Sequence, residues 1–250
     1  MSFKLLSYNI RFGGRGREAR LAEVIRSVAP DLVVFQEAIH PAVIEGLAHA
    51  TGLTHWAARP AHSIGYISRR EVAHHEWHRP AGAKHAFLEI VLAGSEARIF
   101  GLHLTARFSK WSERQRAQEI RALLKGIEQH QHGWHVLVGD FNTLAPGELL
   151  DVRRMPAWIR ALIWISGRDI QRETIQVVLA ANYVDGYRRL HPKEGYTFPT
   201  WDAHLRLDYI FLPTAFAARL KSCEVINQPA AAQASDHFPL LAQLDIAGEG

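Results

Sequence analysis

One pattern occurs twice in the first 142 residues and constrains the fold more than any other feature of the chain. An apolar strand ends at a polar side chain, an amphipathic helix follows, and a second apolar strand ends at a carboxylate. In the first copy, a strand over residues 3–10 contains Asn9, the helix covers residues 21–28, and a strand over 31–35 precedes Glu37. This last strand is apolar without alternation, which is typical of a strand buried on both faces. The pattern therefore predicts an α/β protein.

The second copy begins about ninety residues later and has the same order of elements. A strand over residues 98–104 contains His103, a helix begins at about Ser112, and a strand over 136–138 precedes Asp140. Ser112 with a Gln three residues later forms a capping-box pattern, which predicts the start of that helix. We interpret the two copies as a weak internal duplication. If two sheets pack face to face with helices outside, both copies deliver their polar strand ends to one rim.

The rest of the chain adds strands around these two units. Pro41 and Gly52 bound a second helix, and the segment from residue 143 to about 187 is predicted to be helical and irregular. Further strands are expected within residues 55–92, over 207–212, near 225 and over 239–246. No low-complexity linker divides the chain, so we expect one domain over residues 1–250.

Composition excludes several classes of protein. Hydrophobic residues make up 48% of the chain and charged residues 22%, so the chain is not disordered as a whole. Cys223 is the only cysteine, which excludes an intrachain disulfide and a cysteine-rich zinc or iron–sulfur site. The net charge of +4 and the pI near 9.4 suit an anionic ligand.

The chain has no sequence signal for a membrane span or for secretion. The most apolar stretch, residues 157–165, is about half the ~20 residues that a spanning helix needs, and it contains Arg160. The first ten residues enter a strand directly and lack the pattern of a signal peptide. We therefore expect a cytoplasmic protein, and we expect it to be a monomer.

Polar side chains gather where the predicted strands end. They are Asn9, Glu37, His103, Asp140 with Asn142, Asp208, and Asp236 with His237. Burying several carboxylates beside apolar strands is costly unless a cation compensates their charge. Hard oxygen ligands with imidazoles and without a thiolate suit Mg²⁺ or Mn²⁺ bound together with phosphate oxygens. Metal-assisted hydrolysis of a phosphate ester is the chemistry that matches this set.

In order and wording, these motifs resemble the endonuclease/exonuclease/phosphatase superfamily. The matching pieces are SYNI with Asn9, FQE with Glu37, IGYISR with Arg69, GLHLT with His103, GDFN with Asp140 and Asn142, RLDYIF with Asp208, and SDHFPL with Asp236 and His237. The resemblance implies a four-layered α/β sandwich, in which two mixed β-sheets pack face to face with helices outside. It also implies a single metal-dependent site at the strand ends of both sheets.

The resemblance further implies roles for these residues. Glu37 would be the main Mg²⁺ ligand, with Asn9 and Asp236 nearby. Asp140 would orient or deprotonate the attacking water, Asn142 would hold Asp140, and Asp208 would pair with His237 so that the imidazole donates to a phosphoryl oxygen. His103 would be a second donor. Family members related to deoxyribonuclease pair the counterpart of His103 with a Glu before the IGYISR motif, but residues 54–63 contain no acidic side chain, so His103 is expected without that partner.

Other residues are candidates for contact with the substrate. We expect contacts from Arg69, Arg107 and Trp201, although Trp201 suits a place in the core under the site equally well. The pattern of residues 156–165 predicts a helix with basic and apolar side chains. We favour the interpretation that this helix packs in the core. The alternative is a flap that grips substrate or touches lipid.

The function predicted from the sequence is hydrolysis of a phosphodiester by in-line attack of water, with Mg²⁺ or Mn²⁺ as cofactor and a nucleic acid as the favoured substrate. The alternatives are a phosphoesterase acting on a phospholipid or small molecule, and a binding module for phosphate ligands that has lost turnover.

Overall fold

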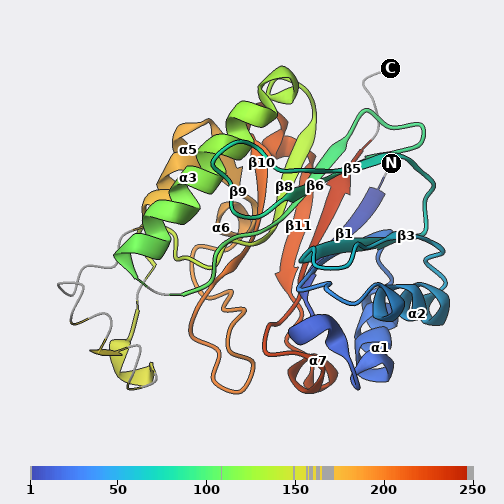
Figure 1. Ribbon diagram of the computed structural model, residues 1–250, viewed down its shortest axis with the longest axis horizontal. Coiled ribbons are helices and arrows are strands. Elements are labelled where there is room, and N and C mark those ends of the chain that lie inside the picture. The colour runs from blue at the N-terminus through green and yellow to red at the C-terminus, as the bar shows by residue number, and fades with distance from the viewer. Residues whose placement is uncertain are drawn as a thin grey trace.

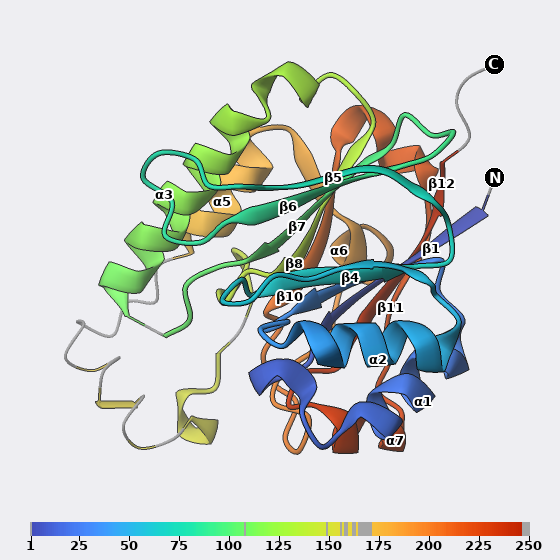
Figure 2. The same ribbon diagram turned by 45° about the vertical axis from the view of Figure 1, so that its right-hand side comes forward.

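Two six-stranded mixed sheets face each other in the computed structural model, with helices on both outer faces (Figure 1). The structure describes residues 2–107, 109–148, 150–155, 157, 160, 161, 164 and 172–246. The rotated view in Figure 2 shows the sheets between the two groups of helices. The predicted four-layered α/β sandwich is confirmed.

The first sheet contains both ends of the described chain. Its strand order is β11 (Leu220–Val225), β12 (Leu240–Asp245), β1 (Ser2–Asn9), β2 (Leu32–Gln36), β4 (Ile64–Ser68) and β3 (His55–Ala57). Strand β1 runs parallel to β2, while the other pairs are antiparallel.

The second sheet is formed by the middle of the chain. Its strand order is β5 (Val72–His78), β6 (Phe87–Leu92), β7 (Arg98–His103), β8 (His135–Asp140), β10 (Asp208–Pro213) and β9 (Tyr183–Asp185). Strand β7 runs parallel to β8, and the other pairs are antiparallel.

Helices cover the outer face of each sheet. Those on the first sheet are α1 (Glu18–Val28), α2 (Pro41–Thr51) and α7 (Pro229–Ala234), and those on the second are α3 (Lys110–Gly126) and α5 (Glu173–Ala180). Helix α6 (Gly186–Leu190) contacts β10 and β11. Short 3₁₀ turns are η1 (Phe12–Gly14), η2 (Glu128–His130), η3 (Val152–Arg154) and η4 (Thr214–Arg219).

The central core lies between the sheets and draws side chains from both. Val34 and Ile64 of the first sheet are buried in the same cluster as Leu88, Val138 and Ile210 of the second. Each such side chain contributes roughly 1.5–3 kcal/mol by leaving water. This shared core holds the two sheets face to face, so the ends of their strands meet at a common edge.

The two copies of the repeated pattern form the two parallel strand pairs. Helix α1 connects β1 to β2, where Asn9 is paired with Gln36, and α3 connects β7 to β8, where His103 is paired with Asp140. The carboxyl ends of parallel strands meet at the same edge of a sheet, so each pair brings its polar ends together.

Several boundaries differ from the predicted ones. Helix α3 begins at Lys110 rather than at Ser112, because the hydroxyl of Ser109 caps it by accepting a hydrogen bond from the Ser112 amide at 3.1 Å. Strand β9 and helix α7 were not predicted from the sequence, since both are short and lack a clear apolar period. The helix predicted over residues 156–165 lies outside the described residues except at four positions.

Within the described ranges, no helix combines the length and the apolar character that crossing a membrane requires.

Candidate active site

Three adjacent strands of the second sheet bring three of the predicted site residues into one row. His103 at the end of β7 is paired with Asp140 at the end of β8, and Asp140 is paired with Asp208 at the start of β10. Residues directly opposite each other in neighbouring strands have Cβ atoms about 4.5–5.5 Å apart. Asp140 and Asp208 are both buried. The strand pairing therefore places two buried carboxylates and a partly buried imidazole in one row.

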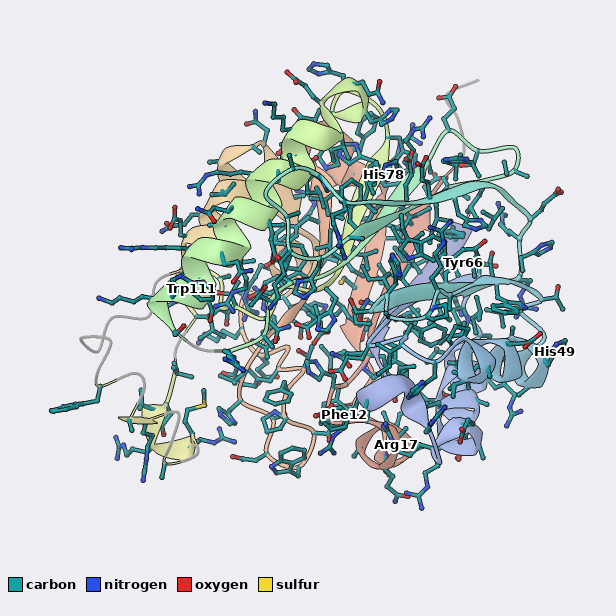
Figure 3. All side chains as sticks on the ribbon, in the orientation of Figure 1. Phe12, Arg17, His49, Tyr66, His78 and Trp111 are labelled. Atoms are coloured by element: carbon teal, nitrogen blue, oxygen red, sulfur yellow. The ribbon has the colours of Figure 1, made fainter. Side chains whose placement is uncertain are left out.

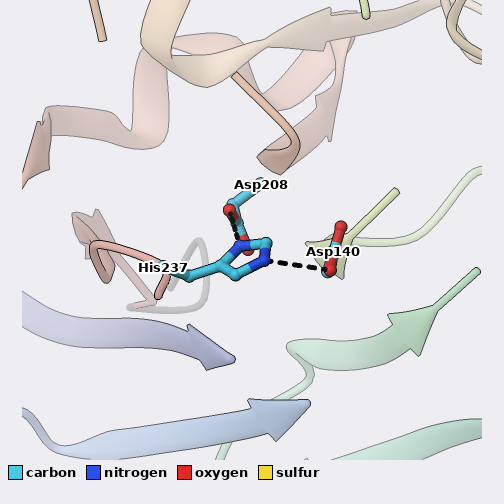
Figure 4. A group of neighbouring side chains, drawn as sticks. All are labelled: Asp140, Asp208 and His237. Atoms are coloured by element: carbon cyan, nitrogen blue, oxygen red, sulfur yellow. Dashed lines mark hydrogen bonds and ion pairs between the residues drawn. The ribbon is translucent and has the colours of Figure 1, made fainter. Parts of the chain in front are cut away.

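His237 completes this row from a loop of the other sheet. Its Nδ1 atom lies 2.9 Å from Oδ2 of Asp208, and its Nε2 atom lies 3.9 Å from Oδ2 of Asp140 (Figure 4). Burial opposes a charge on this ring, but the carboxylates of Asp208 and Asp140 outweigh that cost and raise the pKa of His237 to about 10. His237 is therefore an imidazolium at neutral pH.

Asp140 is held by hydrogen bonds from two sides. Its Oδ1 atom accepts from the backbone amide of Asn142 at 2.8 Å, and its Oδ2 atom accepts from the side chain of Asn9 at 3.0 Å. Burial raises the pKa of Asp140 to about 7, in opposition to the nearby imidazolium of His237. The side chain of Asn142 donates to the carbonyl of Leu104, so Asn142 holds Asp140 through its backbone.

Of the metal ligands predicted from the sequence, Asn9 ends strand β1, and Glu37 and Asp236 lie on loops beside it. Glu37 follows β2, and its carboxylate accepts a hydrogen bond from the amide of Phe12. Oδ1 of Asn9 accepts from the amide of Arg11 at 3.0 Å, and the Nε atom of Arg11 lies 3.3 Å from Oδ2 of Asp236. These contacts link Asn9, Glu37 and Asp236 in one neighbourhood, which the bond from Asn9 to Asp140 joins to the second sheet.

A further group of described residues has the spacing of metal ligands. Oxygen or nitrogen atoms of Asp140, Asp208 and His237 lie within 4.8 Å of one another. The hydrogen bond between His237 and Asp208 already gives both side chains a partner of opposite charge. This group is therefore better suited to holding a proton and a phosphoryl oxygen than to binding a cation.

His103 lies at the side of Asp140 opposite Asp208, and within the described part of the chain no carboxylate is close enough to form a direct hydrogen bond with it. Its Nε2 atom is 3.9 Å from Oδ2 of Asp140, and its buried Nδ1 atom has no hydrogen-bond partner among the described residues. Burial, with the neighbouring rings of His85 and His237, lowers the pKa of His103 to about 4.

The carboxylate of Glu119 lies near His103, but the ring of His85 lies between them. His85 stacks on His103 with ring centroids 6.3 Å apart, and Nδ1 of His85 lies 3.2 Å from Oε1 of Glu119 on α3. Sequence reasoning missed this pair. No sequence signal links Glu119 to a histidine 34 residues earlier.

A buried ion pair on α3 fixes the two loops that carry catalytic candidates. Arg116 is bound to Glu113 at 2.8 Å and donates to the carbonyls of Thr105 and Arg107, just after His103. Glu113 also accepts from the hydroxyl of Thr143, just after Asn142, at 2.7 Å. Sequence reasoning missed these residues as well. Their spacing of three on a predicted helix indicates an ion pair, but it does not indicate burial.

Of the three residues predicted to contact substrate, two lie near the site. Trp201 is 69% exposed, so it does not fill the core, and its ring faces Phe198, whose ring centroid lies 4.7 Å from that of His237. Arg107 is exposed and lines a cavity together with His103.

Arg69 is not brought to the site. Strand β4 runs antiparallel to β2, with Ile64 opposite Gln36 at the site edge and Ser68 opposite Leu32 at the other end. Arg69 follows Ser68, and its amide donates to the carbonyl of Asp31. It therefore lies at the end of the sheet remote from Glu37.

Comparison with protein families and known proteins agrees with this arrangement. The model described as "Endonuclease/Exonuclease/phosphatase family" matches residues 6–237. The comparison with curated protein sequences gave no match.

Solved structures with the same fold include several proteins that share about a fifth of their residues with this chain. A 3' phosphatase from Neisseria bound to product DNA hairpin is 20% identical, with a TM-score of 0.71 over 97% of this chain and 99% of the other. An AP endonuclease from Archaeoglobus fulgidus is 19% identical, with a TM-score of 0.70 over 98% and 100%. An endonuclease/exonuclease/phosphatase from Beutenbergia cavernae is 20% identical, with a TM-score of 0.74 over 99% and 72%.

Proposed function

Because the chain belongs to the endonuclease/exonuclease/phosphatase family and is a phosphoric ester hydrolase, we propose that it cleaves a phosphodiester of a nucleic acid by attack of water. The observation that carries the proposal is the position of Asp140. One of its oxygen atoms lies 3.9 Å from Nε2 of both His103 and His237, and Asn9 from the other sheet donates to the same atom. A water-activating carboxylate thus stands between two imidazoles, where the substrate phosphate would be held.

Asp140 would act as the general base. Each of its oxygen atoms accepts one hydrogen bond, and Oδ2 is the one that lies 3.9 Å from both imidazoles, so Oδ2 would accept the proton of the attacking water. The raised pKa of Asp140, about 7, suits a group that takes up a proton near neutral pH. Both imidazoles are too far from Oδ2 for a direct hydrogen bond, so their Nε2 atoms remain free to donate to the substrate.

His237 and His103 would stabilise the charge that develops on the phosphoryl oxygens. Asp208 keeps His237 protonated, and a charged donor beside a developing oxyanion is worth about 10²–10³ in rate. His103 is neutral at pH 7 and would supply an uncharged donor from the opposite flank. The two rings therefore differ in charge, and the charged one would dominate.

Asn9, Glu37 and Asp236 are the residues that would hold Mg²⁺ or Mn²⁺. They offer oxygen ligands of the kind these ions prefer, and the hydrogen bonds and ion pair through Phe12 and Arg11 hold them in one neighbourhood. When bound, the ion would polarise the phosphate ester and offset the charge of the leaving oxygen.

The exposed residues around the site favour a nucleic acid as the substrate class. Arg107 offers a cation beside His103, and Trp201 offers an exposed ring above Phe198 and His237. The 3' phosphatase of the same fold was solved with a DNA hairpin, which supports this choice.

The test compares the parent with Asp140→Asn on bis-p-nitrophenyl phosphate, plasmid DNA, RNA and a phosphocholine lipid, each with Mg²⁺, Mn²⁺ or chelator. We expect metal-dependent cleavage of DNA or RNA and a loss of about 10²–10⁴-fold in the variant. Glu23→Gln, on the exposed face of α1, is the matched control and should keep full activity.

Three outcomes would overturn the proposal. Cleavage that survives both chelation and Asp140→Asn would remove the mechanism. Turnover of the lipid alone would remove the nucleic acid as substrate, and binding of phosphate ligands without any turnover would identify a binding module.

A further inference from the structure

A cavity of about 460 Å³ opens beside His103, on the side away from Asp208. Its wall includes Lys84 and His85 before β6, Arg107 after β7, and Trp111 in the first turn of α3. Its volume falls within the range of about 300–1,000 Å³ that is usual for small-molecule sites. Because His103 belongs to both the catalytic row and this wall, the cavity is continuous with the active site.

The wall carries positive charge. Among the described residues, the side chains of Lys84 and Arg107 have no ion-pair partner, and none of the residues that line the cavity is acidic. The nearby carboxylate of Glu119 is already occupied by His85, by the amide of Lys84 and by Thr105. An anion that enters the cavity therefore meets two uncompensated cations and no exposed carboxylate.

The wall also carries a large exposed ring. Trp111 is 73% exposed at the beginning of α3 (Figure 3), and it lines the cavity. An exposed indole offers a face on which a nucleic acid base can stack.

We propose that this cavity is a nucleotide subsite, which binds the residue next to the scissile phosphate of a nucleic acid strand. The phosphate of that nucleotide lies against Lys84 and Arg107, and its base stacks on Trp111. This inference rests on the proposed function, since it takes the substrate to be a nucleic acid. A phosphodiester with a single phosphate and no neighbouring nucleotide does not fill the subsite.

The subsite is tested by binding in the presence of chelator, so that turnover does not contribute. The probe is a short fluorescein-labelled oligothymidylate, and its affinity is measured by anisotropy at several salt concentrations. We expect Lys84→Ala to flatten the slope of log affinity against log salt by about 0.7, the value for one contact with a single-strand phosphate. Lys84→Arg should restore the slope. Lys125→Ala, on the exposed last turn of the same α3, is the matched control and should leave it unchanged.

The stacking of a base on the Trp111 ring is tested with a second pair of variants. Trp111→Ala should weaken binding of the oligothymidylate about tenfold, while Trp111→Phe should keep most of the affinity. The same variants should not alter binding of an abasic oligomer, which has the phosphates but no bases. This comparison separates stacking from a general disturbance of α3.

The outcomes distinguish this inference from the proposed function. Suppose that the parent cleaves DNA or bis-p-nitrophenyl phosphate in an Asp140-dependent way, but that the Lys84 and Trp111 variants bind the oligonucleotide as tightly as the parent. The subsite is then wrong and the proposed function stands. If binding depends on both residues but no ester is cleaved, the proposed function is wrong, and the cavity is supported only as a nucleotide-binding site. If Trp111→Ala abolishes sedimentation with phosphatidylcholine vesicles and leaves oligonucleotide binding intact, the cavity faces a lipid surface and the subsite is overturned.

Discussion

Asp140 and Asp208 occupy directly opposite positions on antiparallel strands, and both carboxylates are buried. Two like charges at such positions destabilise a sheet unless a cation lies between them. The imidazolium of His237 is that cation, because it is hydrogen bonded to Asp208 and lies 3.9 Å from Asp140. The charge state of the row formed by His103, Asp140 and Asp208 therefore depends on a side chain from a loop of the other sheet.

Asp208→Asn is predicted to impair catalysis without removing the general base. The carboxylate of Asp208 is the largest favourable influence on the charge of His237, so its neutralisation lowers the pKa of that ring. We expect kcat to fall by about 10²–10³-fold with a smaller change in KM. Steady-state kinetics with Glu23→Gln as control would check this. An unchanged kcat would show that protonated His237 does not act in the rate-limiting step.

The stability of the protein is predicted to decline in alkaline solution because of the same pair. The pKa of His237 is about 10 in the folded protein and 6.5 ordinarily, so its stabilising contribution is complete below pH 6.5 and is lost as the pH rises to about 10. The slope is at most about 1.4 kcal/mol per pH unit. Urea unfolding with chelator between pH 6.5 and 10 should show a shallower decline for Asp208→Asn than for the parent. Equal slopes would contradict the assigned charge.

His103 is predicted to titrate near pH 4, far from the ordinary value of 6.5. Burial lowers its pKa first, and the neighbouring His85 and His237 lower it further. The folded state thus disfavours the proton, and the contribution of this group to stability is lost as the pH falls from 6.5 towards 4. The ring resonances of His103 in an NMR titration would give its pKa, to be compared with the ordinary imidazole value of 6.5. A His103 ring that titrates near 6.5 would contradict this prediction.

Gly139→Ala is predicted to destabilise the fold strongly. Gly139 precedes Asp140 with φ of +146°, and an added Cβ atom would lie 1.9 Å from the carbonyl oxygen of Leu102 on the neighbouring strand. We expect a loss of more than about 3 kcal/mol in the free energy of unfolding. Gly46→Ala in helix α2 is the control, since the added methyl meets nothing within 4 Å and should stabilise by about 0.5–1 kcal/mol. Chemical denaturation of both variants gives the comparison, and a wild-type midpoint for Gly139→Ala would refute it.

Arg116→Met is predicted to cost about 3–5 kcal/mol of stability, because it leaves the carboxylate of Glu113 buried without its cation. It also removes the hydrogen bonds that hold the carbonyls of Thr105 and Arg107 after β7. The double variant Arg116→Met with Glu113→Gln should recover part of the lost stability but not the activity. Thermal and urea unfolding with parallel assays would check both parts, and full activity in the double variant would show that the network does not position the loops.

Much of the site was predictable from the sequence because polar residues at strand ends stand out against apolar strands. His103, Asp140 and Asp208 each end or begin a strand whose pattern is plain, and the register of those strands confirms that they meet. The pairing of Asp208 with His237 also agrees with the expectation. Arg69 was wrongly grouped with them, since its motif matches but β4 runs in the opposite direction and carries it away.

The sequence by itself determined the order of the two strand–helix–strand units, the absence of an intrachain disulfide and the set of polar residues at strand ends, because apolar periodicity and residue chemistry are local properties. Only the tertiary structure decided that His85 stacks on His103 and contacts Glu119. It also decided that Trp201 is exposed, and that Lys84, Arg107 and Trp111 line one cavity. These contacts join loops and helix ends that are far apart in the chain. Their positions follow from how the two sheets and their helices pack, and no local pattern in the sequence encodes that packing.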